Sequence, residues 1–578
     1  MNALPCLTAL LFLSLPSLAQ QHPDAIRLNQ IGFYPDAPKI AVVADANAET
    51  FEVKEAGSGK TVLKGKLGAV RTSQHSGKHT RLADFGAVRK PGTYVVEVPG
   101  LGKSATFRIS REVHRQVAEA SLKGFYYQRA STGLPEKYAG KWAREAGHLD
   151  DKVLVHASAV SRGRPENTVI SSPRGWYDAG DYNKYIVNSG ITMGTLLALY
   201  EDYPLYFENF NVNIPESNNG VPDLLDELAW NLRWMLTMQD PADGGVYHKL
   251  TNPRFDGMIM PEAAKNPRYV VQKSTAATLD FVAVTAQAAR VFKNFKGKFP
   301  GLADSCTTVA VRAWQWAEKN PELLYNQDEM NKLFDPDVAT GTYGDRSVKD
   351  EWLWAGAEMY ILTGKPAYIE KAGPGLEQPF ALPTWNQVSA LGYYTLLRPH
   401  YDVVAEPKVL NTIKNNLITY ADGLLTDLEK QPYYTVMGKT AKDYSWGSSS
   451  VAANQGIALL YAYRLTKDRK YLDAALGNLD YLLGRNATGY CFLTGFGTRR
   501  VMHPHHRPSI ADGVVEPIPG LLSGGPNPGQ QDKCTTYPNK FADESFTDND
   551  KSYASNEIAI NWNAPFVYLA AALEASMK

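Results

Sequence analysis

Two stretches far apart in the 578-residue chain hold acidic side chains in unusual surroundings. In residues 175–185 (GWYDAGDYNKY), Asp178 and Asp181 stand three residues apart in a glycine-containing turn flanked by aromatic residues. Near the C-terminus, Glu557 precedes an apolar run, and a carboxylic acid held against apolar neighbours has a raised pKa. One carboxylate that activates water and one acid that protonates a leaving oxygen are the groups that glycoside hydrolysis uses.

Both motifs also have a simpler structural interpretation. Asp and Gly favour turns for backbone reasons alone, and an acidic residue at a helix N-terminus complements the helix dipole. Because any large protein offers pairs of acidic residues, the residue types alone leave hydrolysis as a hypothesis.

A third polar stretch, residues 503–507 (HPHHR), lies in a long Gly- and Pro-rich segment. Three histidines within four residues would suit zinc, but no Cys or carboxylate stands at ligand spacing. We therefore favour hydrogen-bonding side chains that line a cleft, where His and Arg would bind hydroxyls or adjust the pKa of a carboxyl group.

The composition excludes some classes of function. Lys and Arg together number 60, as do Asp and Glu, so no basic surface suggests a nucleic-acid partner. The 32 Tyr and 11 Trp are compatible with a carbohydrate-binding cleft as well as with a large core. No stretch after the N-terminus is apolar enough to predict a membrane span.

Residues 1–20 resemble a secretory signal peptide, which predicts a secreted or periplasmic protein. An apolar run from Leu7 to Leu15 precedes a small-x-small site at Ser17 and Ala19, although no Lys or Arg stands before the run. The mature chain would then hold Cys306, Cys491 and Cys534, an odd number. A bridge between Cys491 and Cys534 is one option that the sequence does not decide.

The hydrophobic pattern predicts two domains. Residues 21–110 contain short alternating strands separated by Gly and Pro, which favours a small β-sandwich. After residue 110 the pattern becomes helical, which predicts either a solenoid or a closed α/α toroid with long loops at 132–187 and 486–555. The stronger helices are expected at 113–127, 188–202, 223–238, 274–293, 303–318, 348–363, 408–429, 448–465, 468–484 and 556–576.

An ordered series of motifs extends through the mature chain. They are Leu28–Pro35, Phe125–Arg129, Asp178–Asp181, Ile214–Gly220, Asp243–Lys249, Pro504–Arg507 and Asn556–Glu557, the last within a pattern that includes Phe546, Asp548, Tyr553, Ala559 and Asn563–Ala564. With them the chain resembles glycoside hydrolase family 9 (cellulase family E), specifically members with an N-terminal immunoglobulin-like domain.

This resemblance implies an all-α (α/α)6 barrel over residues 111–578, preceded by an all-β immunoglobulin-like sandwich over 21–110. It also implies an inverting hydrolase of β-1,4-glucans. Asp181 would be the general base, Asp178 its partner on the attacking water, and Glu557 the general acid. His505, placed with the catalytic residues, and Arg507 would contact the sugar around the scissile bond. The other residues assigned to substrate binding are Tyr553, Asp548, Trp176 and His506.

No cofactor is expected for the chemistry. Relatives often hold structural zinc through two cysteines, but Ala130 and Gly147 occupy those positions here and leave His148 alone, so zinc is not expected. A loop with Asp345, Ser347, Asp350 and Glu351 resembles a calcium-binding loop of the family. An acidic helix N-terminus explains these four residues equally well.

The leading hypothesis is a monomeric, exported, endo-acting β-1,4-glucanase. An exo-acting relative, which releases glucose, cellobiose or glucosamine units, and a xyloglucan-specific endoglucanase are the alternatives. A binding protein without catalysis is disfavoured because all three acidic residues are present. The sandwich is expected to brace the barrel rather than to bind sugar, since the link between the domains is short.

Overall fold

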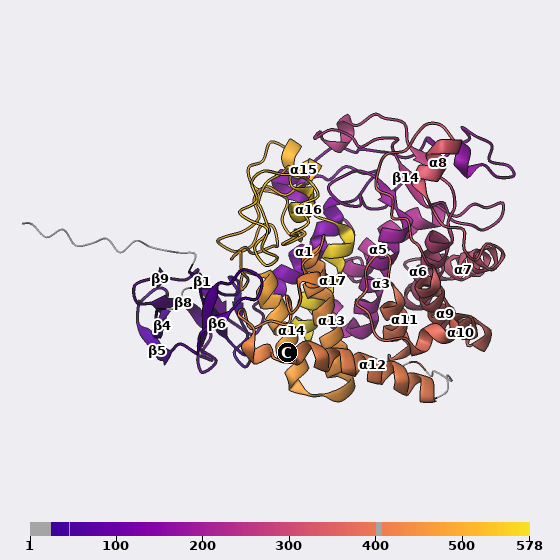
Figure 1. The fold of residues 1–578 in the computed structure, drawn as a ribbon. Helices are drawn as coiled ribbons and strands as arrows, with labels where there is room; N and C mark the ends of the chain where they lie inside the picture. Colours follow the sequence, from indigo (N-terminus) through magenta and orange to yellow (C-terminus); the bar gives the residue numbers. More distant parts are fainter. Residues whose placement is uncertain (1–24, 45–46, 400, 402–406) are drawn as a thin grey trace, which may run out of the picture.

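The computed structural model describes residues 25–44, 47–399, 401 and 407–578. The predicted signal peptide therefore lies outside the described residues. A small β-domain sits against one side of a larger helical domain (Figure 1).

The N-terminal domain is a sandwich of two sheets, as predicted. One sheet has the strand order β1-β3-β7-β6, and the other has the order β2-β10-β8-β4-β5 with β9 paired to β8. All pairs are antiparallel except β2 with β10. Phe33, Phe85 and Phe107 meet edge-on or tilted in the core between the sheets. The strands are β1 (Ile26–Arg27), β2 (Gly32–Phe33), β3 (Ile40–Val43), β4 (Thr50–Glu55), β5 (Thr61–Lys66), β6 (Arg71–Thr72), β7 (His79–Asp84), β8 (Gly92–Val98), β9 (Gly102–Lys103) and β10 (Phe107–Ile109).

The helical domain is an (α/α)6 barrel in which outer and inner helices alternate along the chain. The outer helices are α1 (Arg115–Tyr127), α5 (Asp223–Thr237), α7 (Leu302–Lys319), α10 (Pro366–Ala372), α12 (Pro407–Leu425) and α14 (Arg469–Leu482). The inner helices are α3 (Ile186–Asp202), α6 (Thr275–Phe292), α9 (Lys349–Thr363), α11 (Ser389–Leu396), α13 (Ser448–Thr466) and α17 (Ile560–Ser576).

Hydrophobic patterning explains which helices lie inside. Helix α17 is buried on all sides over Ile560–Glu574, and α6 is buried at nearly every position. By contrast, α1, α5, α7 and α14 are amphipathic and bury one face. A helix that is apolar all round needs partners on every side, whereas an amphipathic helix can cover a surface.

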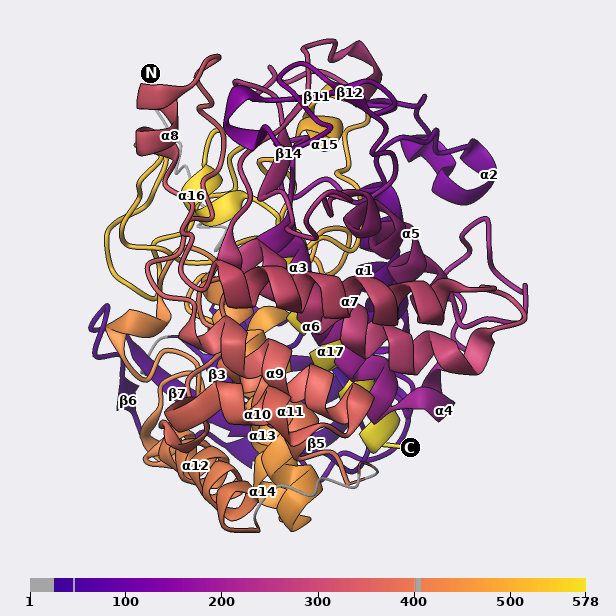
Figure 2. The same cartoon turned by 90° about the vertical axis from the view of Figure 1, so that its right-hand side faces the viewer.

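Long loops gather at one end of the barrel, the upper end in both Figure 1 and Figure 2. They contain a five-stranded sheet that the sequence did not predict, with the order β12-β11-β15-β14-β13. Its strands are β11 (Val153–Val155), β12 (Val169–Ile170), β13 (Lys184–Tyr185), β14 (Lys249–Thr251) and β15 (Tyr269–Val270). The remaining short helices are α2 (Glu136–Ala139), α4 (Pro204–Phe207), α8 (Gln327–Leu333), α15 (Arg507–Ala511) and α16 (Tyr553–Asn556).

Buried hydrogen bonds join the sandwich to the barrel. The Tyr34 hydroxyl donates to Glu574 of α17 at 2.6 Å, and the Asn29 amide donates to Asp480 of α14 at 2.8 Å. The Thr80 hydroxyl donates to a backbone carbonyl of the segment between α12 and α13. These contacts fit the expected bracing role.

Two details differ from expectation. Glu557 does not begin a helix, because α17 starts at Ile560. Cys491 and Cys534 are free thiols, as is Cys306, so the bridge that the sequence left open is not formed.

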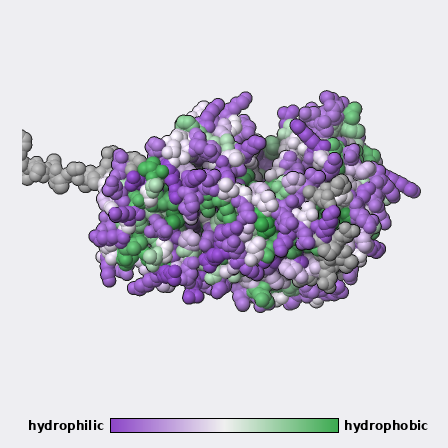
Figure 3. Space-filling model, turned by 60° about the horizontal axis from the view of Figure 1, so that its bottom comes forward, coloured by the Kyte–Doolittle hydropathy of each residue, from purple (hydrophilic) through white to green (hydrophobic). Residues whose placement is uncertain are grey.

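Within the described residues, we find no helix long and apolar enough to cross a bilayer. The face in Figure 3 is mainly hydrophilic, with hydrophobic residues in scattered patches.

Candidate active site

A cavity of about 850 Å³ lies where chain segments enter the inner helices. Segments before α3, α9, α11, α13 and α17 all contribute to its lining. Asp178, Asp181 and Glu557 share this cavity, so the structure brings together two motifs that are far apart in the sequence. We call this cavity the cleft.

Asp178 is held by two hydrogen bonds and is almost fully buried. The Asn188 amide of α3 donates to Oδ1 at 2.6 Å, and the Tyr343 hydroxyl donates to Oδ2 at 2.7 Å. Burial and the negative charge of Asp181 raise the pKa of Asp178 well above its ordinary value, although both hydrogen bonds act in the opposite direction.

Asp181 accepts hydrogen bonds through a single oxygen. Its Oδ2 accepts from the Asn183 side chain at 2.6 Å and from the Tyr185 hydroxyl at 3.2 Å. Both donors come from the residues that lead through β13 into α3. Because Oδ2 is occupied, Oδ1 is the oxygen available to a water molecule.

Glu557 lies between α16 and α17 and is partly exposed to the cleft. Loss of hydration raises the pKa of Glu557 well above its ordinary value, and the charges of Asp181 and Asp178 add to this effect. The Arg507 guanidinium and a backbone hydrogen bond at Gly180 partly oppose it. A glutamic acid in this setting stays protonated to higher pH, as a general acid requires.

Backbone contacts fix Glu557 relative to the aspartates. The Ile560 amide donates to the Asp178 carbonyl at 2.9 Å, and the Arg507 amide donates to the Gly180 carbonyl at 3.2 Å. A side chain at Gly180 would place its Cβ 2.2 Å from the His505 carbonyl oxygen. Glycine at this position therefore permits the close approach of the two segments.

His505, Arg507 and Tyr553 line the cleft as predicted. His505 Nδ1 lies 2.6 Å from the Asp550 carbonyl, and because a carbonyl only accepts, Nδ1 carries the proton. Burial lowers the pKa of His505, which favours a neutral ring with Nε2 as an acceptor. The Arg507 guanidinium donates to the Gly180 carbonyl at 2.7 Å and to the Asp256 carbonyl at 3.0 Å.

Aromatic rings extend from the acidic residues to the cleft walls. Tyr343 packs against Trp385, with ring centroids 5.4 Å apart, on the side of Asp178. Tyr553 packs against Trp446 at 5.5 Å on the side of Glu557. Phe255 and Trp446 are 48% and 43% exposed, so their faces are open to a ligand. Such rings suit stacking against sugars.

Three predicted substrate-binding residues do not line the cleft. Trp176 is fully buried, and its indole donates to Glu227 at 2.8 Å. His506 is buried and points away from the cleft, with its Nε2 2.9 Å from the Gln128 side chain. Asp548 accepts from the backbone amides of residues 502 and 503, so it supports the histidine loop from behind. Trp176 and His506 are therefore buried away from the cleft. A sugar contact by Asp548, which is partly exposed, stays a prediction.

Sequence reasoning missed the residues that orient Asp178 and Asp181. Tyr185 ends the 175–185 stretch and Asn188 lies three residues beyond it, so their closeness in sequence to the two aspartates was the available signal. Tyr343 is 165 positions from Asp178 and has no local signal. Only the fold brings its hydroxyl to the carboxyl group.

The predicted calcium-binding residues lie at the start of α9. Asp345, Ser347 and Asp350 are at least partly exposed, whereas Glu351 is fully buried and both its carboxyl oxygens lack hydrogen-bond partners. Asp280 of α6, which the sequence did not indicate, is also fully buried, and both its carboxyl oxygens lack hydrogen-bond partners. Burial raises the pKa of Glu351 and of Asp280 well above ordinary values, and the negative charges of Asp350 and Asp345 raise both further. Among the residues that the structure describes, no three acidic, His or Cys side chains already form a metal-binding group.

Ala130 and His148, two of the positions considered for zinc, lie in packed surroundings. Ala130 lies in a small buried cluster with Tyr177, Tyr182 and Ala264. His148 Nδ1 is 2.9 Å from the Tyr177 hydroxyl. Burial and neighbouring positive charges lower the pKa of His148 to about 2, so the ring is neutral.

Comparisons with known proteins show the family of the chain. Residues 114–570 match the model of glycosyl hydrolase family 9, and residues 21–103 match the cellulase N-terminal ig-like domain. The xyloglucan-specific endo-beta-1,4-glucanase BoGH9A of Bacteroides ovatus is 48% identical over 97% of this chain and 95% of its own length. Endoglucanase D of Acetivibrio thermocellus is 35% identical over 95% of this chain and 83% of its own length.

A solved structure of a Bacteroides ovatus GH9 protein superposes with a TM-score of 0.92 at 47% identity, covering 96% of this chain and all of that one. The match extends across both domains. The chain therefore belongs to glycosyl hydrolase family 9 and is a glycoside hydrolase with an N-terminal immunoglobulin-like domain.

Proposed function

We propose that this protein is an inverting endo-β-1,4-glucanase that acts on xyloglucan or a related β-glucan. The observation that supports this most directly is one cleft in which Glu557, with a raised pKa, faces an aspartate pair held by separate hydrogen bonds. An inverting mechanism requires an acid and a base about 6.5–9.5 Å apart, with room for water between them.

In the proposed mechanism, Asp181 accepts a proton from water through its free oxygen while Asp178 helps to hold that water. The water attacks the anomeric carbon from the face opposite the leaving group. Glu557 donates its proton to the glycosidic oxygen as that bond breaks. His505 and Arg507 would hold the sugar hydroxyls, and Arg507 would also limit how far the pKa of Glu557 rises.

Xyloglucan is favoured over unbranched cellulose because a relative with 48% identity over nearly the whole chain bears that specificity in its name. The open faces of Phe255 and Trp446 are compatible with a branched chain. Export is proposed from residues 1–20, and a monomer remains our expectation.

We further propose that the carboxyl groups before α9 bind Ca²⁺. Unpartnered, buried oxygens on Glu351 and Asp280 fit a hard cation, with Asp345, Ser347 and Asp350 nearby in the sequence. Binding would require some of these side chains to turn towards the ion. Calcium would neutralise their repulsion and would take no part in the reaction.

Product analysis on xyloglucan, carboxymethyl-cellulose and short cello- and chito-oligosaccharides tests the function. We expect viscosity of the polymer solutions to fall early, with the highest kcat/KM on xyloglucan. Release of monomer or dimer with little loss of viscosity would show exo action instead. A higher kcat/KM on unbranched cellulose would contradict the xyloglucan preference.

A further inference from the structure

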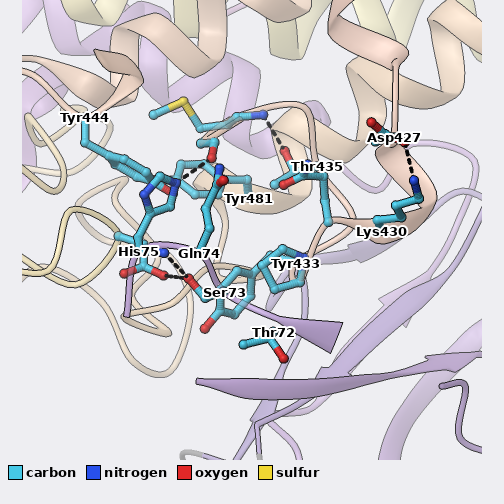
Figure 4. Close-up of a pocket in the computed structure, with 15 residues that line it drawn as sticks. Thr72, Ser73, Gln74, His75, Asp427, Lys430, Tyr433, Thr435, Tyr444 and Tyr481 are labelled. Atoms are coloured by element: carbon cyan, nitrogen blue, oxygen red, sulfur yellow. Dashed lines mark hydrogen bonds and ion pairs between the residues drawn. The ribbon is translucent and has the colours of Figure 1, made fainter. Parts of the chain in front are cut away.

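A second cavity, of about 260 Å³, lies between the sandwich and the barrel. Its walls come from the β6–β7 turn, the segment between α12 and α13, helix α14 and the long loop 486–555 (Figure 4). None of its lining residues is shared with the cleft. We call it the interdomain pocket.

Several contacts hold its walls in place. The Ser73 hydroxyl donates to Asp543 Oδ2 at 2.6 Å, and His75 Nε2 lies 2.7 Å from the Gly438 carbonyl. The His75 ring also packs edge-on against Tyr444, with centroids 5.2 Å apart. Figure 4 shows the rings of Tyr433, Tyr444 and Tyr481 around the same space. The pocket is therefore assembled from both domains.

Two buried polar atoms in this wall have no hydrogen-bond partner. Asp543 is 2% exposed, and while its Oδ2 accepts from Ser73 and Ser76, its Oδ1 accepts from no group. Tyr481 is also 2% exposed, and its hydroxyl lacks a partner. Unsatisfied buried groups are rare and costly, so such a pair calls for an explanation.

The chemistry of the wall selects the class of ligand. Aromatic faces together with a free carboxylate oxygen and a free phenol suit a ring that carries several hydroxyl groups. Among the described residues that line the pocket, Lys430 is the one Lys or Arg. Its side chain is 80% exposed and forms an ion pair with Asp427. A phosphate or carboxylate ligand would therefore find no buried Lys or Arg partner among the lining residues. The volume equals roughly nine liquid-water molecules, which suits one pyranose.

We propose that the interdomain pocket binds a single neutral sugar residue, free or at the end of a short glucan. One hydroxyl of the sugar donates to Asp543 Oδ1, and another accepts from the Tyr481 hydroxyl. The apolar face of the sugar packs against the tyrosine rings. Because both domains build the pocket, a bound sugar also stabilises their association. The sandwich then contributes to sugar binding as well as bracing the barrel.

The test uses the full-length enzyme with D-glucose, D-xylose and cellobiose as probes. Crystals soaked in each sugar should show it against Asp543 and Tyr481. In solution, NMR titration of Tyr481→Phe and Asp543→Asn should show at least tenfold weaker binding at this site, the loss expected for removing a buried hydrogen-bond partner. Hydrolysis of glucan should stay within twofold of wild type, since neither residue lines the cleft.

Tyr434→Phe is the matched control, because this neighbouring tyrosine bonds to Glu429 and does not line the interdomain pocket. It should bind each sugar as the wild type does. Sugar found in the cleft alone would overturn the proposal while leaving the glucanase assignment intact. Ordered water alone in the pocket, or unchanged affinity in both variants, would also overturn it.

Discussion

At the scale of residues, the central feature is that three acidic side chains share one cleft but have different surroundings. Asp178 is buried and bonded through both oxygens, whereas Asp181 keeps one oxygen free. Glu557 has lost hydration and faces two aspartates. Like charges so close cannot all ionise freely, so their different surroundings assign different roles.

Asp181→Asn and Glu557→Gln should each lower kcat by about 10²–10⁴-fold, because each removes a proton-transfer group. Both variants should still bind glucan, since the shapes of the side chains are kept. Kinetics and equilibrium binding on the same substrate would measure this. Asp473→Asn, on the outer surface of α14, is the matched control and should leave kcat unchanged. Near wild-type hydrolysis in either cleft variant would remove that residue from the mechanism.

Arg507→Met should shift the pH profile in a known direction. The Arg507 charge lowers the pKa of Glu557, so removing it should raise that pKa further. A general acid works while protonated, so the alkaline limb of kcat/KM should move to higher pH. Arg115→Met, on the outer helix α1, should leave the limb in place. A move to lower pH would show that Arg507 does not act on Glu557 in this way.

The local backbone and the distance between partners in the sequence explain which site residues could be predicted. His506 has an extended backbone, in which successive side chains point to opposite sides. His505 and Arg507 therefore reach the cleft while His506 packs behind it. Asp178, Asp181 and Glu557 belong to recognisable motifs, but the contact of Tyr343 with Asp178 depends on the closed barrel.

At the scale of elements, the inner helices position the chemistry. The acidic residues and most aromatic walls stand just before the N-termini of inner helices, so barrel closure brings them together. Most long helices could be predicted to within a few residues from their apolar pattern. The short helix α11 could not, because it is buried throughout its eight residues and has no polar face. The small sheet β11–β15 depends on pairing across distant loops.

Calcium should stabilise the start of α9. Removing calcium with a chelator should lower Tm. The drop in Tm on chelation should be smaller in Asp280→Asn than in the wild type. Without calcium, the raised pKa values of Asp280 and Glu351 mean that the folded state binds more protons than the unfolded state, so Tm should fall as pH rises above about 4.5. Added calcium should remove this fall. Identical melting curves with calcium and with chelator would contradict calcium binding.

At the scale of the whole molecule, the sandwich and barrel depend on each other through buried polar contacts. Tyr34 and Glu574 connect the sandwich to the last inner helix, and Asn29 connects it to α14. The interdomain pocket lies in the same interface. The two domains could be predicted from their patterns, whereas the contacts between them could not, because each partner lies hundreds of residues away.

Tyr34→Phe should destabilise the protein by about 1–3 kcal/mol, because it leaves the Glu574 carboxyl without this buried donor. Denaturant unfolding would measure the change. Tyr471→Phe is the control, since its partner Asp422 is about half exposed and can bond to water instead. An equal decrease in the free energy of unfolding in both variants would show that the Tyr34–Glu574 contact stabilises the protein no more than an exposed hydrogen bond does.

The stereochemistry of the first product tests the central claim most directly. A single displacement by water, with Asp181 as base and Glu557 as acid, inverts a β-linkage. NMR during the first minutes of hydrolysis should therefore show the α-anomer before mutarotation. The β-anomer as first product would contradict the inverting mechanism and the roles given to these two residues.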